Sequence, residues 1–316
     1  MISPIIRQLL IALSSQLAAV SVGGLISYPN VLIHQLNSND TMELDLDTSS
    51  WIGSVDGLAG IPSILMPTFM QWKGRKLAFL VSCSLVAVSW ILAYAAKSIS
   101  LIIMSECFHG LGSHSVLIVS SCSMSEFIEP KYRNSLMGSY FILQSLGASS
   151  VVILGQYIHW KTISLIMLVP VVIALLNVLF LWPESPSWLA FKGRYAECEK
   201  NFKWLRGNGE EANDELRQLL SANKEVNVKE TLRKRLFRRD FYIPAILMFV
   251  LLNMMYWSGA EVIMIYPKDL LGKTTDDAAS VSYGIITINV AKFKQLDNSS
   301  DYQEMCSCSS HVHHLQ

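Results

Sequence analysis

The chain has 316 residues, and its 25 Lys and Arg residues are balanced by 25 Asp and Glu residues, so it has no formal net charge. Only 16% of the residues are charged, 51% are hydrophobic, and the mean hydropathy is +0.36. This composition excludes a disordered chain and argues against a cytosolic enzyme. The absence of a net positive charge argues against nucleic-acid binding.

Seven stretches of the sequence are mostly apolar and about 20 residues long, which is the length that a helix needs to cross a bilayer. They cover 8–28, 51–71, 77–96, 101–124, 135–158, 162–182 and 242–266. An eighth stretch, 278–290, is too short for a full span. The sequence therefore predicts an all-α, polytopic membrane protein embedded in the lipid bilayer.

The polar segment 183–241 interrupts this series and reads as short amphipathic helices at about 194–205, 210–222 and 228–239. We therefore expect four parts: a six-helix transmembrane bundle in 1–182, a helical loop in 183–241, the start of a second transmembrane half in 242–290, and a polar tail in 291–316.

The positions of Lys and Arg predict the orientation of the chain. Because the chain changes sides at each span, its most basic segments fall on the same side of the membrane. They are Arg7, 73–76, 131–133 and above all the loop 183–241, and they predict a cytoplasmic N-terminus. The triplet Asn39-Asp40-Thr41 then faces the opposite side, where Asn39 is a glycosylation acceptor.

Several motifs lie at the predicted cytoplasmic ends of the spans. Gly74-Arg75-Lys76 joins spans two and three, Glu126 and Arg133 flank the loop between spans four and five, and PESPSWL, which contains Glu184, follows span six. Span seven contains WSGAEVIMIY. Together these motifs resemble the sugar-porter family of the major facilitator superfamily, and within it the facilitated trehalose and glucose transporters.

The resemblance implies a fold of twelve helices in two six-helix halves joined by a cytoplasmic loop. This chain then corresponds to the N-terminal half, the loop, helix 7 and a partial helix 8, and we expect it to be truncated. The resemblance also implies facilitated transport of a sugar by alternating access, a multi-pass location in the plasma membrane, no enzymatic activity and no cofactor.

Site residues follow from the same resemblance. Arg75, Lys76, Glu126, Arg133 and Glu184 are expected to form a charge network at the inner face that takes part in gating. One departure affects this network, because Gln71 and Trp72 replace the Asp-Arg pair that is usual before Gly74.

The expected substrate-binding residues are Gln144 in span five and Ser258 and Glu261 in span seven. Ionisable residues inside spans are costly and are functional candidates by default. Asp56, Glu106, His109, His114 and Glu261 are such residues. Glu106 and His109 share a helix face, which leaves two interpretations open for them: a proton-coupled site or a hydrogen-bonded pair. The interpretations left open for Glu261 include a pairing with Asp56.

Three alternatives remain at this stage. The chain is a transporter, it is a truncated isoform or fragment that does not transport by itself and can self-associate, or it is a seven-span receptor. The receptor is disfavoured by the predicted cytoplasmic N-terminus. The Cys and His residues of the tail match no standard zinc spacing, so we expect no metal.

Overall fold

The computed structural model describes residues 3–38, 45–207, 209–225 and 239–258. These residues form helices and no strand. Six apolar helical spans are long enough to cross a membrane. They are α1 (Pro4–Ser38); α2 (Leu46–Gly60) with the short 3-10 helix η1 (Ile61–Leu65) and α3 (Met66–Lys73); α4 (Arg75–Ala95); α5 (Ile99–Phe127); α6 (Pro130–Leu154); and α7 (Trp160–Leu181). The predicted all-α membrane fold is confirmed.

The second span differs from the single helix predicted over 51–71. Pro62 and Pro67 stand at the starts of η1 and α3. Proline lacks an N–H group, so each one removes a helical hydrogen bond and the helix tightens locally into η1. The junction residues Gly60 and Leu65 keep right-handed helical dihedrals. The three elements therefore continue as one span.

The first span is longer than the predicted 8–28, because polar residues near its ends are satisfied by neighbouring elements. Gln35 donates to the carbonyl oxygens of Gly155 at 2.8 Å and Ile158 at 2.9 Å. Arg7 donates to the carbonyl oxygen of Trp204 at 2.6 Å. Polar residues lower the hydropathy of the sequence, so the predicted span ends before them. Their hydrogen bonds allow the helix to continue.

The centre of the bundle joins α1, α4 and α7. The rings of Tyr28 and Trp90 pack edge to face with centroids 5.1 Å apart. The Trp90 indole donates to Ser21 Oγ at 2.8 Å, and the Tyr28 hydroxyl lies 2.7 Å from Ser164 Oγ. Every polar atom of these aromatic side chains is thus paired inside the core, as a low-dielectric interior requires.

The helices α1 and α6 approach each other most closely at two glycines. A Cβ atom on Gly23 would lie 1.8 Å from the carbonyl oxygen of Gln144, and one on Gly147 would lie 2.0 Å from that of Val20. Small residues allow backbones to pack directly in a membrane, where the hydrophobic effect does not drive helix association. This crossing fixes α6, and with it Gln144, against α1.

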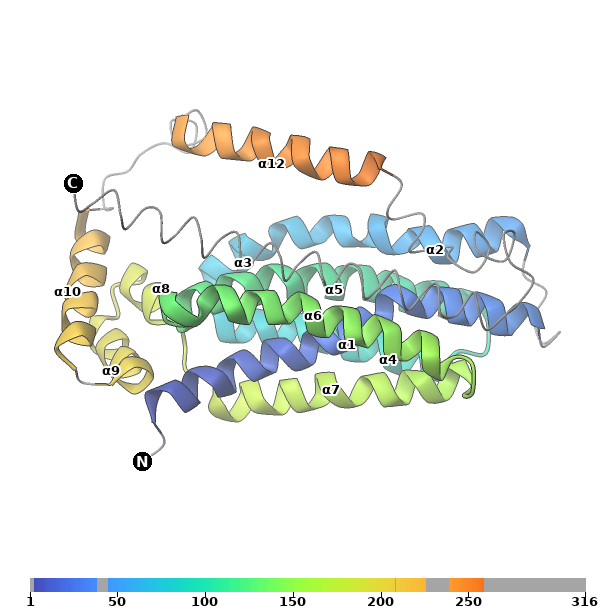
Figure 1. Cartoon of the computed structure of the whole chain (residues 1–316), viewed down its shortest axis with the longest axis horizontal. Helices are drawn as coiled ribbons and strands as arrows, with labels where there is room; N and C mark the ends of the chain where they lie inside the picture. The colour runs from blue at the N-terminus through green and yellow to red at the C-terminus, as the bar shows by residue number, and fades with distance from the viewer. Residues whose placement is uncertain (1–2, 39–44, 208, 226–238, 259–316) are drawn as a thin grey trace.

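Three short helices lie against one end of the bundle, which we call the capped end (Figure 1). They are α8 (Pro186–Phe191), α9 (Tyr195–Arg206) and α10 (Glu210–Glu225). They share a small core that includes Trp188, Cys198 and Leu216. Burial raises the pKa of the Cys198 thiol, so this residue packs as a small apolar group.

The predicted helices 194–205 and 210–222 correspond to α9 and α10, whereas α8 was not predicted. The segment 226–238 lies outside the described residues. The seventh predicted span is described in part, as α12 (Arg239–Trp257), which runs along the outside of the bundle in Figure 1. Its side chains are largely exposed, and that of Trp257 is 88% exposed. The predicted partial helix 278–290 lies outside the described residues.

A Gly23→Ala substitution should destabilise the bundle, because its methyl group would press on the α6 backbone. Overpacking of this kind costs about 1–3 kcal/mol, so the thermal unfolding midpoint in detergent should fall. Gly57→Ala is the matched control, because no atom lies within 4 Å of its Cβ position. Equal midpoints for the two variants would show that the crossing is not closely packed.

Candidate functional site

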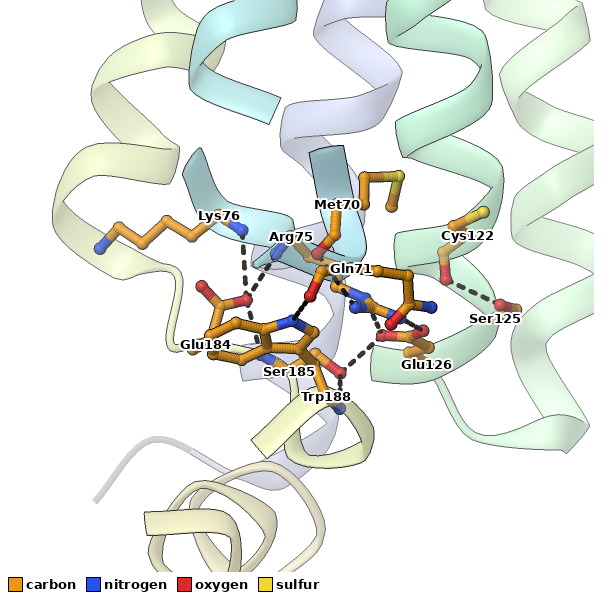
Figure 2. A network of polar contacts seen from close by, with 10 residues as sticks. All are labelled: Met70, Gln71, Arg75, Lys76, Cys122, Ser125, Glu126, Glu184, Ser185 and Trp188. Atoms are coloured by element: carbon orange, nitrogen blue, oxygen red, sulfur yellow. Dashed lines mark hydrogen bonds and ion pairs between the residues drawn. The ribbon is translucent and has the colours of Figure 1, made fainter. Parts of the chain in front are cut away.

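Glu184 caps the N-terminus of α4, although it is more than 100 residues away in sequence (Figure 2). Its Oε1 atom accepts the backbone N–H groups of Arg75 at 2.7 Å, Lys76 at 3.3 Å and Ser185 at 3.1 Å. The first N–H groups of a helix have no partner within the helix and carry a partial positive charge. A carboxylate at this place therefore satisfies both the hydrogen bonds and the helix dipole.

Gly74 makes room for this carboxylate. It links α3 to α4 with φ +97°, and a Cβ atom would lie 2.4 Å from Glu184 Oε2. Only glycine adopts such a dihedral at no steric cost. The Gly74 position thus combines a turn with the close approach of an anion.

Arg75 and Glu126 form a two-bond ion pair between α4 and α5. Arg75 Nε donates to Glu126 Oε2 at 2.8 Å, and Nη2 donates to Oε1 at 2.6 Å. The two side chains are only 7% and 18% exposed. Such a fork matches the planar guanidinium to the planar carboxylate and holds both in a single orientation.

Ser185 extends this pair to the start of α8. Its hydroxyl donates to Glu126 Oε2 at 2.6 Å and also caps α8 by accepting the N–H of Trp188 at 3.3 Å. The Trp188 indole in turn donates to the carbonyl oxygen of Gln71 at 3.0 Å. Gln71 therefore takes part through its main chain, and Glu184 and Glu126 supply the acidic groups. We call Arg75, Lys76, Glu126, Glu184 and Ser185 the capped-end network.

Lys76 ties α4 to the C-terminus of α7. Its Nζ atom donates to the carbonyl oxygens of Leu179 at 3.0 Å and Trp182 at 2.9 Å. The last carbonyl groups of a helix have no partner within the helix, and a cation satisfies them. Lys76 thus stabilises the C-terminus of α7 as Glu184 stabilises the N-terminus of α4.

The structure brings together four of the five residues predicted for the charge network, and the fifth lies apart from them. Arg133 Nη2 donates to the carbonyl oxygen of Ile128 at 3.4 Å, and its Nε is buried without a hydrogen-bond partner among the described residues. Glu126 is instead occupied by Arg75 and Ser185. A role in gating remains a prediction for all five residues.

A second polar cluster, which the sequence did not predict, attaches α9 to α1. Gln8 donates to Glu129 Oε1 at 2.9 Å and to the carbonyl oxygen of Leu205 at 3.2 Å. Arg206 Nη1 lies 3.5 Å from Glu129 Oε1 and Nη2 lies 3.4 Å from Glu215 Oε1. Burial lowers the pKa of Arg206, and the Glu215 carboxylate opposes that shift. A single Gln at the start of an apolar span and single Arg and Glu residues in polar segments give no sequence signal of such contacts.

Two of the three predicted substrate-binding residues lie within the described structure. Gln144 is half-buried on α6. Ser258 is exposed at the end of α12, where its N–H donates to the carbonyl oxygen of Met254 at 3.1 Å. Glu261, Asn39 and the Cys and His residues of the tail lie outside the described residues.

A Gly74→Ala substitution should weaken the cap on α4 as well as strain the turn. Gly193→Ala is the matched control, because Gly193 has φ +76° but no atom within 4 Å of its Cβ position. Both variants place alanine at a positive φ, which costs about 1–3 kcal/mol, and only Gly74→Ala also displaces Glu184. We expect faster hydrogen exchange at the first amides of α4 in Gly74→Ala alone; equal rates in both variants would contradict this role of Glu184.

A Glu126→Gln substitution should destabilise the capped end by about 3 kcal/mol, because it leaves the buried Arg75 without a counter-charge. Glu197→Gln is the control: Glu197 pairs with Arg194 on the surface, with both side chains more than half exposed. Loss of such a surface pair costs about 0–1 kcal/mol. Urea or thermal unfolding in detergent measures the difference, and similar losses in the two variants would count against a buried pair.

Comparison with known proteins identifies relatives of the whole described bundle. The family model described as "Sugar (and other) transporter" matches residues 10–293. The facilitated trehalose transporter Tret1 of Apis mellifera ligustica is 26% identical over 282 residues, which are 86% of this chain and 56% of that protein. The corresponding protein of Culex quinquefasciatus is 23% identical over 279 residues, 85% of this chain and 54% of that protein. The chain thus spans about half the length of these curated relatives.

Solved structures show the same fold. The xylose transporter XylE from E. coli, in a partially occluded inward-open conformation, has a TM-score of 0.71 at 14% identity, over 91% of this chain and 71% of that chain. The proton:xylose symporter XylE bound to 6-bromo-6-deoxy-D-glucose, of the major facilitator superfamily, has a TM-score of 0.76 at 13% identity, over 94% of this chain and 69% of that chain.

Each of these relatives is named as a transporter or symporter, which supports the expectation that the chain is not an enzyme. The resemblance found in the motifs is therefore confirmed by the match to the family model, which covers most of the sequence. The chain is a multi-pass membrane protein with the fold of the major facilitator superfamily, and it belongs to the sugar transporter family.

Proposed function

We propose that this chain acts in the facilitated transport of a sugar of the glucose or trehalose class by alternating access. The proposal is supported by the family and by the names of the relatives. The single observation that carries it is the capped-end network, which concentrates charge-assisted hydrogen bonds at one end of the bundle. Alternating access requires one end of a carrier to be held shut while the other is open.

The contacts of the network divide into two kinds. The Arg75–Glu126 pair joins α4 to α5, which move together within one bundle. The bonds of Glu184 and Ser185 instead hold the segment before α8 against the bundle. We infer that opening of the capped end releases Glu184 and Ser185, whereas the Arg75–Glu126 pair persists.

Sugar recognition needs fixed donors and acceptors, because each hydroxyl group of a sugar both donates and accepts. The half-buried amide of Gln144 offers a donor group and an acceptor. We propose that Gln144 contacts the sugar and that Ser258 and Glu261, on the seventh span, contribute from the other side.

We further propose that the capped end is cytoplasmic and that the membrane is the plasma membrane. Arg7, Arg75, Lys76 and Arg133 lie toward this end of the bundle, in agreement with the excess of basic residues in cytoplasmic segments. Asn39, which follows α1 at the opposite end, then faces outward and can carry a glycan.

Reconstitution of the purified chain into liposomes tests the function. We expect uptake of labelled D-glucose or trehalose above the leak measured with L-glucose. Gln144→Ala should reduce uptake about tenfold, because one lost hydrogen bond is worth about 1–1.5 kcal/mol. Gln218→Ala, an exposed position on α10, is the control and should leave uptake unchanged.

Uptake no faster than leak for both sugars would overturn the proposal for this chain and favour a fragment that does not transport by itself. Equal uptake by the Gln144→Ala and Gln218→Ala variants would remove Gln144 from the binding site but leave transport in place.

A further inference from the structure

Three ionisable side chains meet at the end of the bundle away from the capped end. Glu106 and His109 lie on α5, and Asp56 lies on α2. Glu106 is separated from Glu126, on the same helix, by about 30 Å at about 1.5 Å per residue. The cluster therefore lies apart from the capped-end network.

The three side chains become less exposed to solvent from Asp56 through His109 to Glu106. Asp56 is 32% exposed, His109 is 3% exposed and Glu106 is 2% exposed. His109 Nδ1 lies 2.8 Å from Glu106 Oε2, and His109 Nε2 lies 3.6 Å from Asp56 Oδ1. The Asp56 Oδ1 atom is itself buried and has no hydrogen-bond partner among the described residues. A chain of contacts thus leads from a half-exposed carboxylate to a fully buried one.

The number of protons decides whether both contacts are attractive. When both carboxylates are ionised and the imidazole is neutral, the cluster holds one proton, which His109 Nδ1 donates to Glu106 Oε2. When no other proton is present, Nε2 presents a lone pair to the lone pairs of Asp56 Oδ1, and the two atoms repel. A second proton, on either of these atoms, converts the 3.6 Å contact into a hydrogen bond that needs only a small approach.

The net charge of the cluster points in the same direction. With one bound proton the cluster has a charge of minus two, and with two bound protons it has minus one. Buried charge that is not compensated is costly in a membrane-embedded protein. Uptake of one proton therefore favours the packed arrangement of α2 on α5.

The neighbouring elements supply no cation that would take the place of this proton. Tyr28 of α1 interacts electrostatically with Glu106, and its hydroxyl is bonded to Ser164. His114, one turn further along α5, lies with Nδ1 2.8 Å from the carbonyl oxygen of Gly110. The described Lys and Arg residues of α3, α4 and α6 lie at the capped end, at positions 73, 75, 76, 131 and 133. Lys97, before α5, and Lys161, in the first turn of α7, lie toward the end that holds the cluster, but among the described residues no Lys or Arg forms an ion pair with its three side chains.

The close contact between the two helices makes the cluster sensitive to their spacing. A Cβ atom on Gly110, next to His109, would lie 2.1 Å from the carbonyl oxygen of Asp56. The backbones of α2 and α5 therefore touch beside the cluster. A change in the attraction between Asp56 and His109 acts directly on the packing of the two helices.

We propose that Asp56, His109 and Glu106 form a proton-binding site, and that a bound proton between Asp56 and His109 fastens α2 to α5. Acidification strengthens the contact between the two helices, and alkalinisation weakens it. Histidine ordinarily changes its charge between about pH 5 and 8, so this is the range in which the contact is tested.

Thermal unfolding of the full chain in detergent, measured from pH 5 to pH 8, tests the proposal. The wild type should show a step in its midpoint of about 2–4 °C, with the higher value at acid pH. Asp56→Asn should remove the step and keep the higher midpoint throughout, because the amide N–H donates to His109 Nε2 at any pH. His109→Gln should also remove the step, at a lower midpoint.

His159→Asn is the control for histidine titration. His159 is exposed at the start of α7, where its side chain accepts the N–H of Lys161, and asparagine can replace that function. This variant should keep the wild-type step. A step of wild-type size in Asp56→Asn would overturn the proposal.

The packing of α2 on α5 can also be measured locally, which tests the proposal even where the midpoint of global unfolding does not change with pH. Hydrogen exchange of the α2 amides, corrected for the intrinsic effect of pH, should be slower at pH 5.5 than at pH 8 in the wild type. Asp56→Asn should show slow exchange at both values. Corrected rates in the wild type that are independent of pH would also overturn the proposal.

Discussion

The cap that Glu184 places on α4 is the interaction on which the capped end depends. It requires a carboxylate, a helix N-terminus and a glycine at the same point, and these come from residues 74–76 and 184. The reason lies in the bilayer, where a helix that begins near the hydrocarbon region cannot leave its first N–H groups to water. With α4 fixed in this way, Arg75 points at Glu126, and Ser185 completes the pair at the start of α8.

Much of the fold could be predicted from the sequence because hydropathy is a direct consequence of the bilayer. The first six spans follow from the lengths of the apolar stretches alone. Their ends do not, since the length of α1 depends on hydrogen bonds that Arg7 and Gln35 make with distant elements. The break at η1 depends on the positions of two prolines within a mostly apolar stretch.

The candidate site was predictable as a set of residue types but not as a set of pairs. The motifs place Arg75, Glu126, Arg133 and Glu184 at one end of the bundle, and charge alone would pair Glu126 with either arginine. Geometry selects Arg75, because Ser185 and Glu184 approach α4 from the segment after α7. Arg133 turns instead to the carbonyl oxygen of Ile128. The Ser185-Pro186 pair carried a signal for the start of α8, since a serine before proline is a common helix start.

The two ends of α5 differ in the permanence of their charges, and this difference follows from residue chemistry. At the capped end, Glu126 faces an arginine, which stays protonated at every physiological pH, so the pair is a fixed structural bond. At the other end, Glu106 faces a histidine, and beyond it lies a second carboxylate rather than a cation. A histidine between two carboxylates can satisfy both only when the cluster holds a second proton. One helix therefore carries a contact that is insensitive to pH at one end and a contact that depends on proton supply at the other.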